Sequence, residues 1–314
     1  MDKADIDRNF SIPMVIGGKD DFIEKIERKS TSTSLKAKNN NLEVIHQVIA
    51  KDKMIMIKSE KDAFEFYYIL KGKIQNNETG EVLVADNFIS VQGEVEEAYF
   101  KTTEKTELLL FVNVSIFKGV EKRFNELIAL NNKVLDKDQE TKEHCTRLND
   151  LSLKTAEKLN LKNRQLFALG YASFLHDIGK LNIDTEVLTK PGHLTSAEWE
   201  EMKRHPEMGK ELIQEYLKED YYKNVAKIVH QHHEKYDGSG YPQGLKGEEI
   251  MIEARILAVV DAYDAMTNQR PYQDIMDRDE ALDEIKSCTG GHFCPEVVEA
   301  FLKAEEEYYQ ENIK

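Results

Sequence analysis

Short apolar runs alternate with turn-forming residues over about the first 115 residues of the chain. The runs are rich in β-branched and aromatic residues, and turn segments such as NNETGE at 76–81 separate them. This pattern predicts an antiparallel, β-rich domain over residues 1–116. The runs that we expect to form strands are residues 54–57, 64–70, 81–84, 88–91 and 107–114.

From Phe117 onward, apolar positions recur with the period of a helix rather than that of a strand. Alternating steps of four and three residues define a heptad seam, whose positions are Val120, Phe124, Leu127, Asn131 and Val134. An asparagine in such a seam fixes the register of two-stranded coiled coils. This pattern therefore predicts that residues 117–139 form a connector helix, which pairs two chains in a homodimer. Because the seam spans only about two heptads, a helix packed on its own chain is the alternative.

The rest of the chain, residues 140–314, has helical periodicity almost throughout, with loops at KPGHL and DGSGYPQG. The predicted fold class is therefore α+β multidomain. It combines a small N-terminal β-barrel of regulatory function, the connector helix and a C-terminal all-α helical bundle.

The composition, with 40% apolar and 32% charged residues, is that of a folded globular protein. The acidic start MDKADIDRNF does not predict a signal peptide, and runs such as ILAVV at 256–260 are too short to cross a bilayer. Three cysteines without zinc-type spacing fit a reduced, cytoplasmic protein. The net charge of −15 disfavours binding along a nucleic-acid backbone, although a small phosphorylated ligand remains compatible because bound cations reverse the field locally.

Eight of the nine histidines lie between residues 144 and 292, and several stand beside carboxylates. Glu140 and His144 are four residues apart on one helical face, and Arg147 lies one turn further; an exposed, ion-paired helix is the alternative interpretation. His176 and Asp177 follow the apolar segment LFALGYASFL, which predicts that both are buried. A buried carboxylate next to an imidazole requires a partner, either a structural hydrogen bond between the two or a metal ion.

Further candidate ligands follow along the chain. His205 precedes Pro206 at an expected helix start, where a surface or capping role is the simplest interpretation. His232 and His233 are adjacent, so on a helix their side chains would diverge by about 100° and could reach two metal ions, or one metal ion and one hydrogen-bonding partner of its ligands. Asp261 interrupts an otherwise apolar helix at 254–267, unless it reaches solvent at the helix end.

Imidazoles and carboxylates without thiolates suit first-row ions such as iron(II), manganese or zinc. The candidate ligands are too numerous for one ion, and they predict a cluster of two or three divalent ions.

Taken together, these residues resemble the HD-GYP family of the HD superfamily of metal-dependent phosphohydrolases. The superfamily marks match His144, the pair His176–Asp177, and Asp261. Further family motifs are HDIGK at 176–180, KPGHLT at 190–195, HPEMG at 205–209, HHEKYDGSGYP at 232–242 and DAYDAMTNQRPY at 261–272. The resemblance covers residues from about 140 to about 302. It implies hydrolysis of the bacterial messenger cyclic di-GMP at a bi- or trinuclear site that commonly holds iron or manganese.

The resemblance also implies roles for individual residues. The implied metal ligands are Glu140, His144, His176, Asp177, His205, His232, His233 and Asp261. Lys180 and Asp177 would serve catalysis, with Lys180 on a phosphate, and Tyr241 and Arg270 would contact substrate. Two positions depart from the family pattern: Gln273 replaces a basic residue, and HFCP with Cys294 replaces HFDP.

The N-terminal segment FYYILKGKI, with a glycine closing one strand, resembles a small cupin-type barrel. Cupin enzymes bind metal through clustered histidines, whereas this half contains only His46, so we expect a cupin that has lost its metal. An antiparallel barrel of another kind is the alternative.

The sequence thus predicts a phosphodiesterase that converts cyclic di-GMP to pGpG and, in a second round, to GMP. One alternative is an enzyme of the same superfamily acting on cyclic GMP-AMP or on a nucleotide monophosphate. The other is a module that senses a cyclic dinucleotide without cleaving it.

Overall fold

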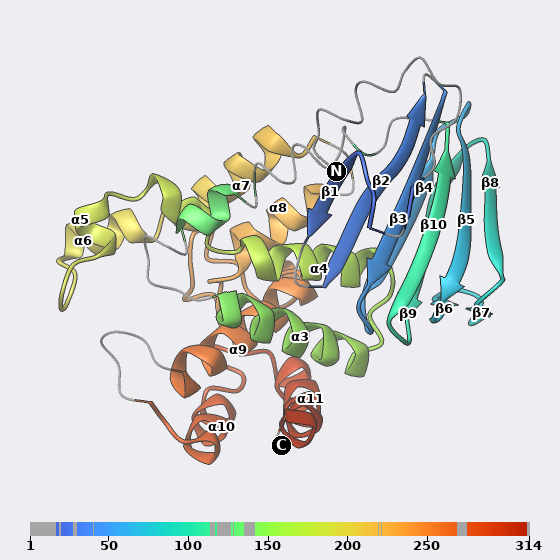
Figure 1. The fold of residues 1–314 in the computed structure, drawn as a ribbon. Helices are drawn as coiled ribbons and strands as arrows, with labels where there is room; N and C mark the ends of the chain where they lie inside the picture. The colour runs from blue at the N-terminus through green and yellow to red at the C-terminus, as the bar shows by residue number, and fades with distance from the viewer. Residues whose placement is uncertain are drawn as a thin grey trace. The chain divides into compact units, whose positions relative to one another are not determined.

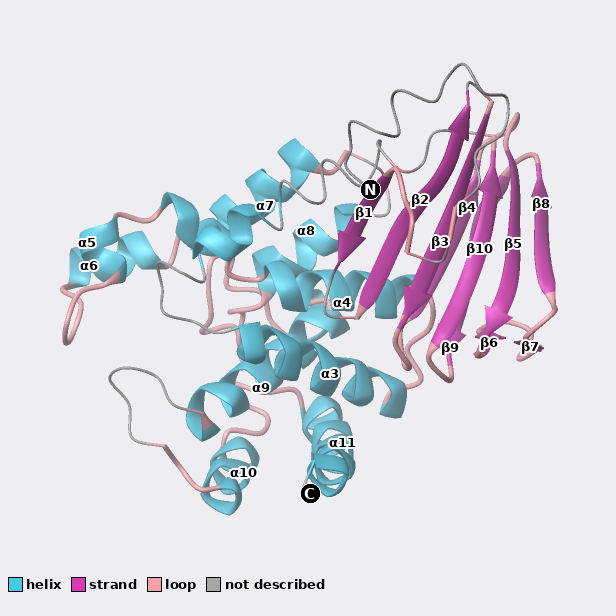
Figure 2. Ribbon diagram, viewed as in Figure 1, coloured by secondary structure: helices cyan, strands magenta, loops and turns pink. Residues whose placement is uncertain are grey.

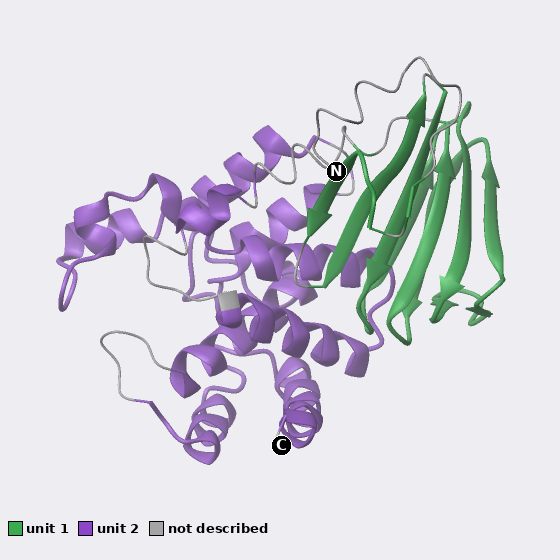
Figure 3. Cartoon of the chain, in the orientation of Figure 1, with its two compact units in different colours: residues 1–122 green, residues 123–314 purple. Residues whose placement is uncertain are grey.

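The computed structural model describes residues 17–18, 20–27, 30–39, 41–113, 117, 127, 129–134, 142–218, 220, 222–268 and 275–312. The chain divides into two compact units, residues 1–122 (unit 1) and 123–314 (unit 2) (Figure 3). Glu140 and Arg270, both predicted site residues, and Gln273 lie outside the described residues. Among the described helices, none has both the length and the apolar character needed to cross a bilayer.

The described part of unit 1 is all β (Figure 2). Its strands are β1 (Glu24–Glu27), β2 (Thr31–Asn39), β3 (Leu42–Ile49), β4 (Met54–Ser59), β5 (Phe64–Lys71), β6 (Lys73–Asn76), β7 (Val82–Val84), β8 (Phe88–Gln92), β9 (Val95–Thr102) and β10 (Thr106–Val112). They form a six-stranded sheet in the order β1-β2-β3-β10-β5-β8 and a four-stranded sheet in the order β4-β9-β6-β7. The predicted β-rich domain is confirmed, while a closed barrel stays a prediction.

The core of unit 1 follows from the alternation of buried side chains along strands such as β10. In β10, Leu108, Leu110 and Val112 are buried, and the residues between them are only partly buried. Leu110 lies opposite Ile45 of β3 and Tyr67 of β5 in the antiparallel register. Buried side chains of both sheets belong to one hydrophobic cluster, so the core lies between the sheets.

Part of the predicted connector helix is described, namely residues 127 and 129–134, which are helical. Leu127, Asn131 and Val134 are all buried within the chain, and the Asn131 side-chain amide donates a hydrogen bond to the Phe174 carbonyl oxygen at 3.0 Å. Asn131 therefore packs on its own helical unit, and the burial of all three positions within one chain favours the intramolecular alternative over a coiled coil. The remaining seam positions, Val120 and Phe124, lie outside the described residues.

The described part of unit 2 is helical, as predicted (Figure 1). Its α-helices are α3 (Lys142–Lys158), α4 (Arg164–Leu175), α5 (Thr185–Leu188), α6 (Ser196–Met202), α7 (His205–Tyr216), α8 (Tyr222–Gln231), α9 (Ile252–Thr267), α10 (Arg278–Ser287) and α11 (Pro295–Asn312). Two 3₁₀ turns, η1 (Ile178–Asn182) and η2 (Gly247–Glu249), complete it.

Helix α9 lies at the centre of unit 2, in contact with α3, α4, α8, α10 and α11. A helix that is apolar on most sides must be buried on most sides, and Ala254, Ile256, Leu257, Val259 and Val260 have no exposed surface. The last turns of α9 carry Asp261 and Asp264, so the central helix brings two carboxylates next to α3 and α4.

Candidate metal centre

The backbone around Gly179 fixes how the first candidate ligands meet. Helix α4 ends at Leu175, and His176 and Asp177 occupy the turn into η1. A Cβ atom at Gly179 would lie 1.9 Å from the His205 carbonyl oxygen and 2.5 Å from the Gly209 amide nitrogen. Only glycine allows η1 to approach the first turn of α7 this closely. This contact brings Asp177 next to His205, although 28 positions separate the two residues along the chain.

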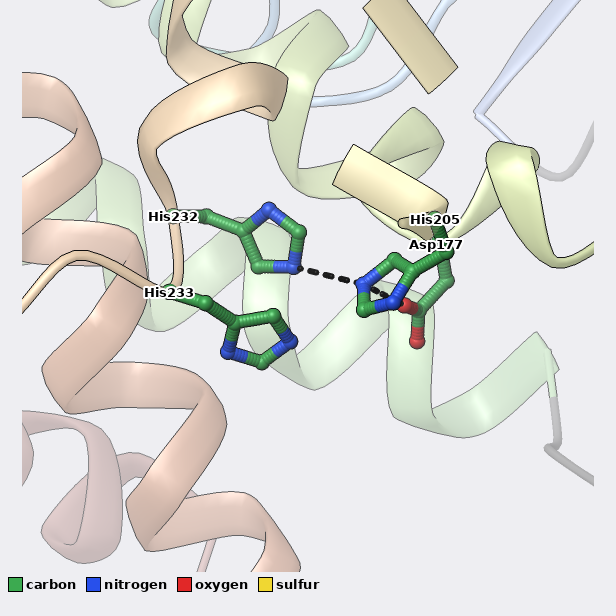
Figure 4. A group of neighbouring side chains, drawn as sticks. All are labelled: Asp177, His205, His232 and His233. Atoms are coloured by element: carbon green, nitrogen blue, oxygen red, sulfur yellow. Dashed lines mark hydrogen bonds and ion pairs between the residues drawn. The ribbon is translucent and has the colours of Figure 1, made fainter. Parts of the chain in front are cut away.

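One group of candidate ligands consists of Asp177, His205, His232 and His233, whose ligand atoms all lie within 4.8 Å of one another (Figure 4). His205 Nε2 lies 3.2 Å from Asp177 Oδ1 and 3.4 Å from His232 Nε2. Three separate elements supply the group: the turn after α4, the start of α7 and the segment after α8.

The hydrogen bonds at Nδ1 show which ring nitrogens could bind a metal. His205 Nδ1 lies 2.8 Å from the Met202 carbonyl oxygen, and His232 Nδ1 lies 2.6 Å from that of Val229. A carbonyl oxygen only accepts, so each Nδ1 carries the proton and, in the neutral ring, Nε2 keeps its lone pair. Two acceptor nitrogens then face each other across 3.4 Å. A cation between them would satisfy both, so the donor set fits a divalent metal ion.

The charge states of these side chains are also those that bind a metal ion. Burial lowers the pKa of His232 to about 3 and that of His233 well below the usual value, assisted by the neighbouring imidazoles. The rings are therefore neutral, which is the ligating form. Burial alone would raise the pKa of Asp177, but the charges of Lys180 and His176 outweigh it and hold that pKa well below its usual value. The group thus consists of neutral imidazoles and one ionised carboxylate.

A second group consists of His144 on α3, His176 and Asp261 on α9, again with ligand atoms within 4.8 Å of one another. Asp177 lies between the two groups. Its Oδ1 faces His205, whereas its Oδ2 lies 3.1 Å from His176 Nε2 and 2.8 Å from Lys180 Nζ. One carboxylate thus presents a different oxygen to each group.

Asp264 orients His144 in this second group. Its Oδ2 lies 2.6 Å from His144 Nδ1, and its two oxygens accept from Arg147 Nε and Nη2 at 2.6 and 3.0 Å. Burial would raise the pKa of Asp264, but the hydrogen bonds from His144 and Arg147 hold it below its usual value. An ionised carboxylate on Nδ1 leaves Nε2 as the atom available to a metal.

Tyr241 closes the centre on the side of His233. The two rings are 4.9 Å apart between centroids and inclined by 31°. Burial raises the pKa of the Tyr241 hydroxyl, and the charges of Asp177 and Asp261 add to that shift while Lys180 opposes it. The hydroxyl therefore keeps its proton and can donate a hydrogen bond.

The family model described as "HD domain" matches residues 123–297, more than half of the chain. The chain belongs to the HD domain family. The resemblance to the HD-GYP family drawn from the sequence motifs is confirmed for this domain.

Curated relatives of the HD domain carry related names. A "Cyclic di-GMP phosphodiesterase" of Thermotoga maritima is 39% identical over 212 residues, covering 67% of this chain and 57% of that protein. The "Cyclic di-GMP phosphodiesterase response regulator RpfG" of Xanthomonas campestris is 39% identical over 185 residues, covering 59% and 49%. The "3'3'-cGAMP-specific phosphodiesterase 2" of Vibrio cholerae is 34% identical over 201 residues, covering 64% and 38%. The match thus spans about half the length of these relatives.

The arrangement of the paired histidines differs from the sequence-based expectation. Helix α8 ends at Gln231, so His232 and His233 lie beyond it and the helical offset of about 100° does not apply. Their ring centroids are 4.0 Å apart, and both belong to the group around His205. The helical divergence of about 100° is therefore not realised, and the ligand roles of the two histidines stay a prediction.

The loop after these histidines is held by a residue that sequence reasoning missed. The buried carboxylate of Glu234 accepts from the backbone amides of Gln243 at 2.7 Å and Leu245 at 3.0 Å. A Cβ atom at Gly240 would lie 2.2 Å from the Lys235 amide nitrogen, so this glycine permits close approach to its own chain rather than to a ligand. Glu234 and Gly240 thus fix the loop that carries Tyr241. The position of Glu234 directly after His233 was the available signal.

Proposed function

We propose that the chain is a metal-dependent phosphodiesterase that hydrolyses cyclic di-GMP to linear pGpG, and pGpG to GMP in a second round. The carrying observation is the position of Asp177, whose two oxygens each face one group of imidazoles. Such a carboxylate suits a site for two neighbouring cations, which is the arrangement used for in-line displacement at phosphorus. The names of the Thermotoga and Xanthomonas relatives support this substrate.

The two groups divide the proposed ligands. Asp177, His205, His232 and His233 would hold one ion, and His144, His176 and Asp261 would hold a second, with Asp177 shared. Glu140 remains the proposed ligand of a third ion, outside the described residues. Iron, or manganese, suits these ligands. Divalent cations supply Lewis-acid chemistry here: they lower the pKa of water and neutralise charge on phosphoryl oxygens.

The residues around the cations would position the substrate. Lys180 Nζ lies 2.8 Å from Asp177 Oδ2, and its side chain keeps 13% exposure, so the ammonium would also contact a phosphate oxygen bound at the centre. Its charge would stabilise the phosphoryl oxygens as the 3′ oxygen leaves. The Tyr241 hydroxyl would donate to the same phosphate. Arg270 remains a proposed substrate contact.

Cyclic GMP-AMP is the second candidate substrate. Relatives of Vibrio cholerae named as 3'3'-cGAMP-specific phosphodiesterases match 57–64% of the chain at 32–34% identity. The proposed ligands would not discriminate guanine from adenine, because the cations that they hold would act on phosphate and not on the base. For unit 1 we propose a regulatory role on a cupin-like barrel, and for the whole protein a cytoplasmic location and a homodimer.

The test uses the full chain, purified without oxygen and loaded with iron or manganese. Cyclic di-GMP and cyclic GMP-AMP are supplied separately, and products are resolved by chromatography alongside elemental analysis of the protein. We expect turnover of cyclic di-GMP, and loss of both metal and turnover in Asp177→Ala. An Asp177→Ala protein with normal metal content and normal turnover would contradict the proposal.

A further inference from the structure

The single tryptophan of the chain, Trp199, stands in an unusual place. It lies on α6, a helix with no buried residue, and its side chain is among the exposed large hydrophobic ones, at 47%. In Figure 1, α5 and α6 lie at the outer edge of the helical unit. An indole gains most when it is buried, and α6 offers it no core to fill.

Helix α6 is nevertheless firmly held. Thr195 and Glu198 form a reciprocal capping box at its start, and Lys190 Nζ lies 2.8 and 2.6 Å from the two oxygens of Glu198. Glu201 accepts from the Asp184 backbone amide at 3.0 Å. Trp199 is therefore presented from an ordered helix, so a ligand that contacts it need not first order this segment.

The indole continues a series of rings that begins at the metal centre. The centroid of Trp199 lies 6.5 Å from that of Tyr241 at an interplanar angle of 75°, and Tyr241 in turn lies 4.9 Å from His233. His233 belongs to the group that contains Asp177. Trp199 is thus one aromatic ring removed from a candidate ligand, on the side of the centre that Tyr241 closes.

We infer that Trp199 is the stacking platform for one purine base of the cyclic dinucleotide whose phosphate lies at the metal centre. The inference rests on the proposed function. A phosphate held at the cations and Lys180 leaves the attached nucleoside to extend past Tyr241, and an exposed indole face binds a purine ring by stacking. Purine stacking is tolerant of base identity, so Trp199 would bind guanine and adenine alike.

The surroundings of Trp199 favour a small aromatic ligand over a protein partner. Its helix reads SAEWEEM, in which Trp199 is the one aromatic residue and three of the other six residues are glutamates. Protein-docking surfaces are contiguous apolar patches, whereas Trp199 is the one exposed large hydrophobic side chain of this acidic helix. A nucleobase is uncharged, and stacking requires only the indole ring.

The experiment compares the wild type, Trp199→Ala and Trp199→Phe as metal-loaded full chains. KM and kcat are measured for cyclic di-GMP and for methyl 4-nitrophenyl phosphate, a diester without a nucleobase. Indole fluorescence of the wild type is followed during titration with cyclic di-GMP, and each reading is completed before the substrate is turned over. Phe88→Ala, at a 56% exposed ring of unit 1, is the matched control for loss of an exposed aromatic side chain.

We expect cyclic di-GMP to quench the indole, and Trp199→Ala to raise KM for cyclic di-GMP about 5- to 150-fold, the range for one base stack. Trp199→Phe should recover most of the loss, and kcat/KM for the baseless diester should not change. An unchanged KM, no quenching, or equal losses on both substrates would each overturn the inference. If the wild type hydrolyses no cyclic dinucleotide, the proposed function itself has failed.

Discussion

Replacing Asp264 by asparagine tests how the second ligand group is built. The carboxylate accepts from His144 Nδ1 at 2.6 Å, from Arg147 Nε at 2.6 Å and from the Asn268 side-chain amide at 3.0 Å. An amide has one oxygen and two donor hydrogens. In either orientation, Asp264→Asn turns a donor towards His144 or Arg147, each of which is already a donor.

The expected magnitude follows from these contacts. Hydrogen bonds to a charged group contribute about 1.5–3 kcal/mol each, but Arg147 is 30% exposed and can regain water, so we expect a loss of about 2 kcal/mol in the free energy of unfolding. The larger effect should be on metal. Loss of the group that orients a ligating histidine typically weakens metal binding or activity by about 10- to 100-fold.

The assay combines metal titration, elemental analysis and urea denaturation of the metal-free protein. Asp264→Asn should lose the ion of the His144 group while keeping the ion held by Asp177, His205, His232 and His233. Asp279→Asn is the control, since the Asp279 side chain is 90% exposed. If Asp264→Asn bound both ions with wild-type affinity, the orientation of His144 would not depend on this carboxylate and the reasoning would be refuted.

Three further predictions follow from single contacts. Gly179→Ala places a methyl group 1.9 Å from the His205 carbonyl oxygen, so η1 and α7 must separate; we expect lower metal content and a lower melting temperature, measured by elemental analysis and calorimetry. Glu234→Gln leaves one of two loop amides without its carboxylate acceptor, and KM for cyclic di-GMP should rise with metal content unchanged. The pKa of Asp264 is depressed in the folded chain, so its stabilisation is complete above the ordinary value of about 3.9 and is lost as pH falls through the folded-state pKa. Acid denaturation of the metal-free protein should therefore be shallower in Asp264→Asn, and an identical pH profile would argue against the pair with Arg147.

The sequence predicted strands at several apolar runs, but it missed the apolar strand β3 and polar strands such as β2, whose formation depends on pairing within the sheet. The runs at 54–57, 64–70 and 107–114 lie in β4, β5 and β10. Strand β2, with the sequence TSTSLKAKN, has Leu35 as its main buried apolar residue, and it exists because it pairs along its length with β3. Polar strands of this kind depend on a register that local patterning does not contain.

Prediction of the site had a similar limit. Adjacent residues such as His176 and Asp177 can be recognised in the sequence as a candidate pair. The ordered motifs identify His205, which is ambiguous alone. Asp264 could not be assigned to His144, because 120 positions separate them and only the packing of α9 on α3 joins them. The helical offset misled the interpretation of His232 and His233 because the helix ends one residue earlier.

The charge of the protein makes substrate binding depend on its cations. The chain has a net charge of −15, and Asp177 and Asp261 both lie in the centre where, under the proposed function, a doubly negative dinucleotide binds. Lys180 is already paired with Asp177, so without metal ions the phosphate would approach carboxylates at close range, which disfavours binding. Chelation should therefore abolish quenching of Trp199 by cyclic di-GMP but leave the weaker quenching by guanosine, which carries no phosphate, unchanged. Equal affinity for cyclic di-GMP with and without metal would mean that the phosphate binds elsewhere, and that Asp177 does not share the cations that receive it.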